Sequence, residues 1–174
     1  MKTLKKYLTE RLTIKNKNYK YYPETKQELQ DIIKKRIEQE GSEVNLNDID
    51  VSNITDMSDL FFGLNFNGDI SNWDVSNVSN MRGMFWECKS FNQDISGWDV
   101  SNVTNMGGMF CNCYVFNQDI SNWDVSNVTN MNRMFYRCET FNQDISSWEV
   151  SKVNKSWEIF YKCPIEEKYK PQFK

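Results

Sequence analysis

Histidine is absent from this chain of 174 residues. Serine and cysteine hydrolases activate their nucleophile with a histidine, and the usual zinc sites include histidine ligands. The chain also lacks any apolar stretch of about 18 residues, so the sequence predicts no membrane-spanning helix. Its first 25 residues hold no apolar run of signal-peptide length, and as written the chain is expected to stay in the cytoplasm.

Charge is distributed unevenly, although the net charge is only −3. Residues 1–45 carry 11 basic and 7 acidic side chains, whereas residues 46–163 carry 7 basic and 15 acidic ones. Residues 164–174 carry 3 basic and 2 acidic side chains. The middle segment therefore has a net charge of −8. Because nucleic-acid phosphates require a basic surface, we expect no nucleic-acid partner.

A unit of 25 residues recurs four times with little change, beginning at Phe66, Phe91, Phe116 and Phe141. The first copy reads FNGDISNWDVSNVSNMRGMFWECKS. A degenerate copy precedes it, with Asp48 near the place of the tryptophan. Asn, Ser and Asp at fixed places cause the low mean hydropathy, which is therefore no sign of disorder. A strict period predicts stacked repeats that bury apolar residues only against their neighbours.

Within each copy the apolar spacing changes once. The order I-x-x-W-x-V-x-x-V is close to the strand core of leucine-rich repeats, and the Trp73-x-Val75 pair alternates as in a short strand. Val78, Met81, Met84 and Phe85 then have helical spacing, with Ser76 as a candidate N-cap. These patterns predict an α/β fold, a leucine-rich-repeat-type solenoid of strand-plus-short-helix repeats with an N-terminal helical cap.

The predicted domain organisation has three parts. Residues 1–45 form a basic N-terminal segment with a capping helix, residues 46–163 the repeats with degenerate first and last copies, and residues 164–174 a C-terminal tail. Thr25 and Glu28 have capping-box spacing, and Gly41 is placed to end the helix. The apolar face of this helix comprises Leu29, Ile32, Ile33 and Ile37. A second, short basic amphipathic helix is expected over residues 2–11.

Equivalent residues of successive copies should stack in columns. The tryptophan column comprises Trp73, Trp98, Trp123 and Trp148, and a phenylalanine column comprises Phe85, Phe110, Phe135 and Phe160. Cys88, Cys113, Cys138 and Cys163 form a third column, with Cys111 in addition. We interpret these thiols as small buried packing residues rather than metal ligands or catalytic groups. No metal and no cofactor is predicted.

Acidic side chains form two further columns. The first comprises Asp69, Asp94, Asp119 and Asp144, and the second comprises Asp74, Asp99, Asp124 and Glu149. Stacked carboxylates suit Ca²⁺, but aspartate equally accepts backbone N–H groups in turns, and the turn role is favoured for the first column. The second column lies between Trp and Val and should face outward. It is a candidate contact surface.

Positions that differ between copies are free to specify a partner. They are Arg82, Gly107, Asn132 and Trp157; then Trp86, Cys111, Tyr136 and Tyr161; then Glu87, Asn112, Arg137 and Lys162. Aromatic residues mixed with arginine are typical of binding hot spots, so Trp86, Glu87, Tyr136, Arg137 and Tyr161 are candidate binding residues. The alternative is an exposed face that drifts without selection.

The unit F-N-x-D-I-S-x-W-D-V-S-x-V-T-x-M-x-x-M-F resembles the BspA-like leucine-rich repeat family, the 25-residue type of mycoplasma surface proteins. The resemblance covers roughly residues 46–163 and brings no catalytic residues with it. It implies a bacterial or phage protein that binds other macromolecules, often at a cell surface.

These observations predict a non-catalytic binding module with a protein partner, with a glycan as the second ligand class. The alternative function is an acidic structural or decoy scaffold that occupies a basic surface on another macromolecule. No enzymatic activity and no particular oligomeric state is predicted.

Overall fold

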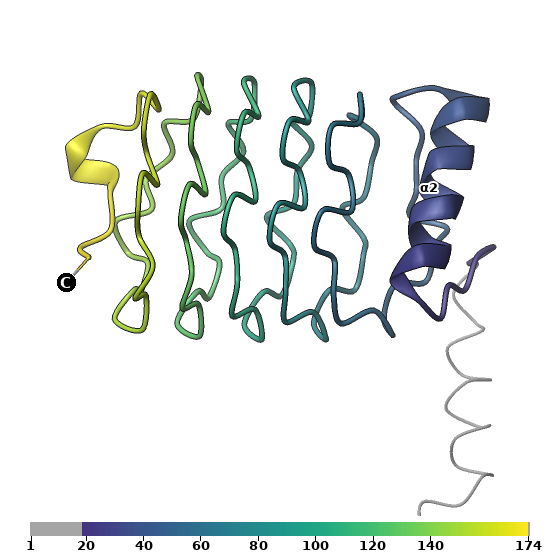
Figure 1. The fold of residues 1–174 in the computed structure, drawn as a ribbon, viewed down its shortest axis with the longest axis horizontal. Coiled ribbons are helices and arrows are strands. Elements are labelled where there is room, and N and C mark those ends of the chain that lie inside the picture. Colours follow the sequence, from purple (N-terminus) through teal and green to yellow (C-terminus); the bar gives the residue numbers. More distant parts are fainter. Residues whose placement is uncertain (1–18, 174) are drawn as a thin grey trace, which may run out of the picture.

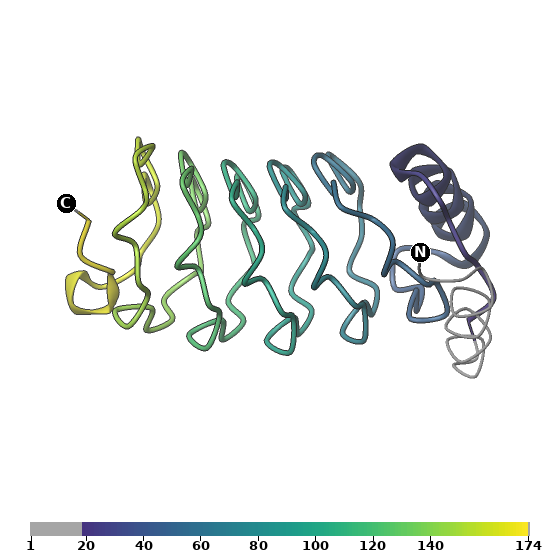
Figure 2. The same ribbon diagram turned by 90° about the horizontal axis from the view of Figure 1, so that it is seen from below.

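The computed structural model describes residues 19–173, in which the repeats follow one another in a single row (Figure 1). The helix α2 (Lys26–Glu40) closes one end of the row, and the short 3-10 helix η1 (Glu167–Tyr169) lies at the other. The view turned by 90° shows the same order (Figure 2). The helix expected over residues 2–11 lies outside the described residues. None of the helices in the described part is long and apolar enough to cross a membrane.

The predicted α/β leucine-rich-repeat solenoid is wrong. Within residues 19–173, no repeat contains an α-helix or a β-strand, and the chain forms no sheet. Pairing of the β type between repeats is limited to isolated parallel bridges at one position per repeat: Asp56 to Asn80, Asn80 to Asn105, Asn105 to Asn130, and Asn130 to Lys155. Another bridge joins Tyr21 to Ile49 beside α2. Each repeat is a succession of turns.

The segment with helical spacing is not a helix because its N–H groups point in two directions. In the first full copy, the N–H groups of Met81, Gly83, Phe85 and Glu87 donate to carbonyls of the next copy, at 2.8–2.9 Å. Between them, the N–H groups of Met84 and Trp86 donate to carbonyls three residues back within the same copy, and that of Arg82 donates to Asn80 Oδ1. Gly83 and Glu87 have φ values of 61° and 62°, which a right-handed helix cannot include. The predicted N-cap, Ser76, instead donates through its N–H and Oγ to Asp74.

The Trp73-x-Val75 pair faces inward as predicted, but it is too short to be a strand. A turn closes on each side of it, since Trp73 N–H donates to the Ile70 carbonyl and Val78 N–H to the Val75 carbonyl. Contacts to the neighbouring copy come mainly from side chains here. Each tryptophan Nε1 donates to a carbonyl of the preceding copy, at 2.9–3.2 Å. At this position the indole N–H therefore makes the hydrogen bond between repeats that backbone N–H groups make in the segment from Met81 to Glu87.

Aromatic columns run through the core, as predicted for Trp and Phe. Trp73, Trp98, Trp123 and Trp148 are only 4–5% exposed. Phe85, Phe110, Phe135 and Phe160 stack with ring centroids 5.7–5.8 Å apart. A second column, from Phe66 through Phe91 and Phe116 to Phe141, lies beside it, and Phe85 and Phe91 are 4.0 Å apart. Stacked rings of this kind stabilise each repeat only through its neighbours.

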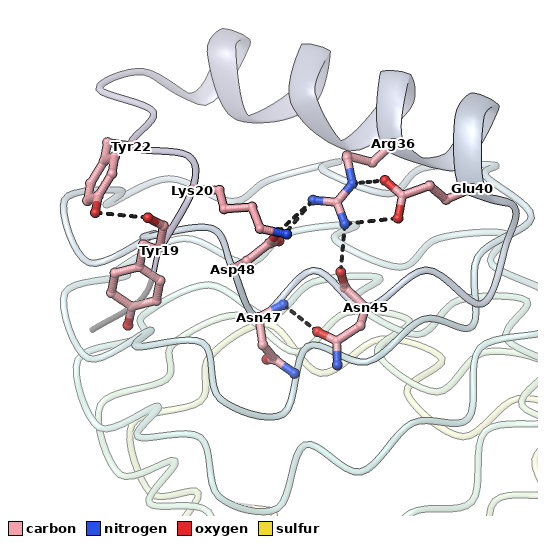
Figure 3. A network of polar contacts seen from close by, with 8 residues as sticks. All are labelled: Tyr19, Lys20, Tyr22, Arg36, Glu40, Asn45, Asn47 and Asp48. Carbon is pink, nitrogen blue, oxygen red and sulfur yellow. Dashed lines mark hydrogen bonds and ion pairs between the residues drawn. The ribbon is translucent and has the colours of Figure 1, made fainter. Parts of the chain in front are cut away.

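The helix α2 has the predicted ends. Thr25 Oγ1 accepts the N–H of Glu28, and Gly41, with φ 92°, donates its N–H to the Ile37 carbonyl. Leu29 and Ile33 are fully buried against the repeats, whereas Ile32 and Ile37 are only partly buried. Arg36 is also buried, which the apolar pattern did not predict. It donates to Glu40, to Asp48 and to the Asn45 carbonyl, and so ties the helix to the first turn (Figure 3).

The other end of the row is covered over part of its area. Ile165 is buried there, and Ile145 N–H donates to the Tyr169 carbonyl of η1 at 3.0 Å. The Lys170 Nζ lies 5.6 Å from the centre of the Phe160 ring, the outermost ring of its column. The two ends are thus closed by different elements.

Candidate binding surface

The variable positions lie in the segment whose N–H groups donate to carbonyls of the next copy, residues 81–87 of the first full copy. The column that begins at Phe62 continues through Trp86, Cys111, Tyr136 and Tyr161, one side chain per copy. Cys111 is buried, with 2% exposure, whereas the aromatic members of the column are partly or largely exposed. The buried cysteine therefore divides the column into two aromatic groups.

The first group stands at the C-terminal end, and we call it the Arg133 cluster: Arg133, Tyr136, Arg137, Trp157 and Tyr161. The Arg133 guanidinium lies 4.2 Å from the centre of the Trp157 ring and 5.3 Å from that of Tyr136. Its Nε is 3.1 Å from Glu158 Oε2. Tyr136 and Tyr161 stack with centroids 5.0 Å apart. Trp157 and Tyr161 are 58% and 45% exposed, which makes this cluster a large aromatic surface open to solvent.

Two polar atoms in the neighbouring column have no hydrogen-bond partner among the described residues. They are Arg137 Nε and Asn112 Oδ1, both buried although their residues are only half-buried. Arg137 adopts φ 56° and donates its N–H to the Tyr161 carbonyl. Glu87 has the equivalent place two copies earlier and is half-buried. A buried polar atom without a partner costs free energy, so a ligand that pairs with it gains affinity.

The second group stands beside α2, at the other end of the row. An open cleft of about 560 Å³ lies there, lined by Gln30, Lys34, Asp59, Leu60, Phe62, Leu64, Arg82 and Trp86. Phe62 is 50% exposed, and its ring centroid is 6.1 Å from that of Trp86. Arg82 pairs with Asp59 at 3.1 Å on the rim. The cleft thus combines an aromatic wall with charged residues at its edge.

Glycine gives Trp86 its place on the surface. A Cβ on Gly108 would lie 3.0 Å from Trp86 Cε3, so the indole would have to shift by a few tenths of an ångström to lie over any other residue. The equivalent residue one copy later is Arg133, with φ 56°. The same left-handed position therefore carries a glycine under an aromatic ring in one copy and an exposed cation in the next.

Sequence reasoning selected Trp86, Glu87, Tyr136, Arg137 and Tyr161 as one set, and the structure divides them. Tyr136, Arg137 and Tyr161 lie together, whereas Trp86 belongs to the cleft. It did not select Arg133 or Phe62. The sequence did mark Arg133 as unusual, because it replaces the glycine found at the two equivalent positions 83 and 108. Phe62 could have been found as the equivalent of Trp86, since it stands 24 residues before it.

The second acidic column faces solvent, as predicted. Asp74, Asp99, Asp124 and Glu149 are all exposed, and each accepts the N–H of the serine two residues later. Hydrogen bonds from Ser101 and Ser126 lower the pKa values of Asp99 and Asp124. The first column has the predicted turn role, since Asp69, Asp94, Asp119 and Asp144 accept serine N–H groups in the same way. No group of three acidic, cysteine or histidine side chains that could hold a metal ion occurs within residues 19–173.

The cysteines are packing residues, as interpreted from the sequence. Cys88, Cys113 and Cys138 are fully buried, and each Sγ lies 2.8–2.9 Å from a phenylalanine carbonyl of the preceding copy. None forms a disulfide. Burial raises the pKa of Cys88 to about 12 and that of Cys111 to about 11. Both thiols are therefore protonated at neutral pH, which is the unreactive form.

Comparison with models of protein families shows to which family the chain belongs. A family model described as "Mycoplasma protein of unknown function, DUF285" matches residues 27–119 and, a second time, residues 97–170. The chain belongs to this family. The resemblance to mycoplasma-type repeats is confirmed in this coarser form, but membership of the BspA-like leucine-rich repeat family is not shown. No curated protein and no solved structure gives a significant match.

Proposed function

We propose that this chain is a non-catalytic protein-binding module and that the Arg133 cluster is its contact surface. The supporting observation is the exposure of Trp157 and Tyr161 beside Arg133, in repeats whose other aromatic residues are mostly buried. Trp, Tyr and Arg are the residues most enriched among binding hot spots, because they offer large rigid surfaces with a polar group. The cluster occupies variable positions, so its chemistry is not needed to build the repeat.

Side-chain order supports the same proposal. Arg133 is held between the rings of Trp157 and Tyr136 and by Glu158, so little conformational entropy is lost when a partner covers the cluster. Ordered aromatic groups around a cation are suited to bind a protein surface that carries a carboxylate or an exposed carbonyl.

The alternative, an acidic scaffold, is supported by the outward column of Asp74, Asp99, Asp124 and Glu149. These carboxylates are exposed in successive copies and would attract a basic surface. Such binding depends strongly on salt, whereas a hot-spot interface of aromatic contacts tolerates it.

One experiment separates the two functions. A partner is captured on the immobilised chain from a lysate of the encoding organism, purified, and its Kd measured with three proteins at low and high salt. They are the wild type, an Arg133→Gly/Trp157→Asn variant and an Asp99→Asn/Asp124→Asn variant. The first pair places at each position a residue that other copies carry there, as at Gly108 and Asn132, so the turns are preserved.

We expect the Arg133→Gly/Trp157→Asn variant to bind about 30-fold more weakly and the Asp→Asn variant to bind normally. A Kd weakened by Asp→Asn and by salt supports the acidic scaffold instead. Equal affinity of all three proteins contradicts both assignments of the surface.

A further inference from the structure

The last copy of the repeat ends in an open row of backbone donors. At each internal interface, the N–H groups of four alternate residues donate to carbonyls of the next copy. Met131, Arg133, Phe135 and Arg137 do so toward residues 155–161, at 2.8–3.0 Å. The equivalent residues of the last copy are Ser156, Glu158, Phe160 and Lys162. Among residues 19–173 none of these four N–H groups has an acceptor.

The donor row is accessible. Ser156 and Lys162 are exposed, and so are Trp157 and Tyr161 between them. The C-terminal segment covers a different part of this end, where Tyr169 accepts the N–H of Ile145. A row of unpaired donors at such an edge is the template on which an extended segment of another chain adds its carbonyls.

A second copy of this chain is poorly suited to fill the row. The carbonyls that would match it are those of Ser58, Leu60 and Phe62 in the first turn, which have no partner among the described residues. The helix α2 stands at that end: Lys26 Nζ donates to Ser58 Oγ, and Lys34 lines the cleft with Leu60 and Phe62 (Figure 1). Two donor rows cannot pair with each other either. The occupant must therefore bring carbonyls from an uncovered segment.

Charge indicates the chemistry of that segment. Lys155 and Lys162 are exposed at the two ends of the row. Lys170 lies over the Phe160 ring but is already paired with Glu167. The acidic residue within the row, Glu158, is already paired with Arg133. Lys155 and Lys162 are therefore the charges that the row offers to a partner, although residues 46–163 together carry a net charge of −8.

We infer that the last copy binds an extended, acidic peptide segment of another protein. The carbonyls of this segment accept the N–H groups of Ser156, Glu158, Phe160 and Lys162, and its carboxylates pair with the lysines at the ends of the row. Trp157 and Tyr161 offer ring faces to its side chains. Trp157 and Tyr161 also belong to the Arg133 cluster, but the backbone hydrogen bonds of this contact do not depend on that cluster being a binding surface.

Amide hydrogen exchange of the ¹⁵N-labelled full chain tests the inference, with a synthetic peptide of alternating Glu and Val as the probe. In the free protein we expect fast exchange at Ser156, Glu158, Phe160 and Lys162 and slow exchange at Met131, Arg133, Phe135 and Arg137. The peptide should slow exchange at the first four amides. A counterpart with Lys in place of Glu should bind about tenfold more weakly or worse.

A Ser156→Pro variant removes one donor, and Ser156→Ala is its matched control with the N–H retained. We expect Ser156→Pro to weaken peptide binding and Ser156→Ala to bind the peptide as the wild type does. The inference is overturned by slow exchange of the four amides in the free protein, or by peptide binding that does not protect them. It is equally overturned by no binding at about 1 mM peptide, or by protection that rises with protein concentration and so indicates a second copy.

Discussion

The Arg36 Nη1 of α2 donates to both carboxylate oxygens of Asp48, at 2.9 and 3.1 Å (Figure 3). Asp48 directly precedes Ile49, which stands where each later copy carries a buried tryptophan: the Ile49 N–H donates to the Leu46 carbonyl as the Trp73 N–H donates to that of Ile70. The first turn has no preceding repeat whose carbonyl could accept an indole N–H, and the apolar Ile49, only 1% exposed, needs no such acceptor. The ion pair therefore joins the cap to the first turn one residue before the position that continues the Trp column.

Replacing Asp48 by Ala should lower the free energy of unfolding by about 1–3 kcal/mol, because the buried Arg36 guanidinium loses one of its two carboxylate partners and keeps Glu40. Urea denaturation followed by tryptophan fluorescence measures the change. Lys20→Ala is the control, because the Lys20 side chain is 73% exposed and its pairing with Asp48 contributes less than about 1 kcal/mol. Similar losses in the two variants would show that Arg36 finds other partners.

Acid should weaken the same contact. Burial by itself raises the pKa of Asp48, but hydrogen bonds and charges from Arg36 and Lys20 outweigh it and hold the pKa below its ordinary value. A carboxyl with a lowered pKa in the folded state contributes stability that is complete above its unfolded pKa of about 3.9 and is lost as the pH falls through the folded pKa. The stability difference between wild type and Asp48→Asn should thus be constant from pH 7 to about 5 and shrink below about 4. A difference that persists at the lowest pH would assign the stabilisation to a neutral hydrogen bond.

The sequence predicted which residues are buried better than it predicted the backbone. Period and residue type sufficed to place Trp123, Phe110 and Cys113 in the core, since an identical copy on each side leaves them nowhere else to pack. The same period could not show that the Met81–Phe85 segment is a chain of turns. Apolar spacing of three and four fits a helix and these turns alike. Residues 83 and 87 make this segment turns rather than a helix, because their φ angles are positive. A pattern of apolar residues does not reveal such angles.

The candidate surface was predictable in part for a similar reason. A position that differs between copies is not needed to build the repeat, and this criterion identified Tyr136 and Tyr161 as candidate binding residues. Trp86 and Tyr136 belong to separate aromatic groups because Cys111 between them is buried. The sequence could not predict this, because the burial of a variable position depends on the folded structure.

Trp123→Ala should cost about 3–5 kcal/mol of unfolding free energy, because the residue is buried in the middle of its column and the cavity cannot collapse. Its Nε1 also donates to the Ile95 carbonyl at 3.2 Å, so Trp123→Phe, which keeps most of the volume, should still cost about 1 kcal/mol or more. Denaturant melts of both variants and of Glu139→Ala, an exposed control within about 0.5 kcal/mol of wild type, provide the comparison. An unchanged Trp123→Ala melt would contradict the burial of the tryptophan column.

Glycines of the repeats should differ sharply in their tolerance of alanine. Gly83 has φ 61°, and a Cβ there would lie 2.2 Å from Asp59 Oδ1, so Gly83→Ala should destabilise by about 1–2 kcal/mol or more. Gly97 has no neighbour within 4 Å of its Cβ position, and Gly97→Ala should be neutral or slightly stabilising. Thermal melts of the two variants measure the difference. Equal effects would mean that the Asp59 side chain and the left-handed turn adapt without cost.

Thiol reactivity should follow burial. Cys163 is half-buried, whereas the other four cysteines are buried, and burial raises the pKa of Cys163 to about 11, below the value of about 12 for Cys88. Because the thiolate is the reactive form, iodoacetamide at pH 8 should modify Cys163 first in the native protein and the remaining thiols only after unfolding. Mass spectrometry of the digested protein identifies the modified site, and Cys163→Ser is the control that should remove the early product. Early labelling of Cys113 would instead mean that neighbouring repeats separate in the native state, since its Sγ lies 2.8 Å from the Phe85 carbonyl deep in the stack.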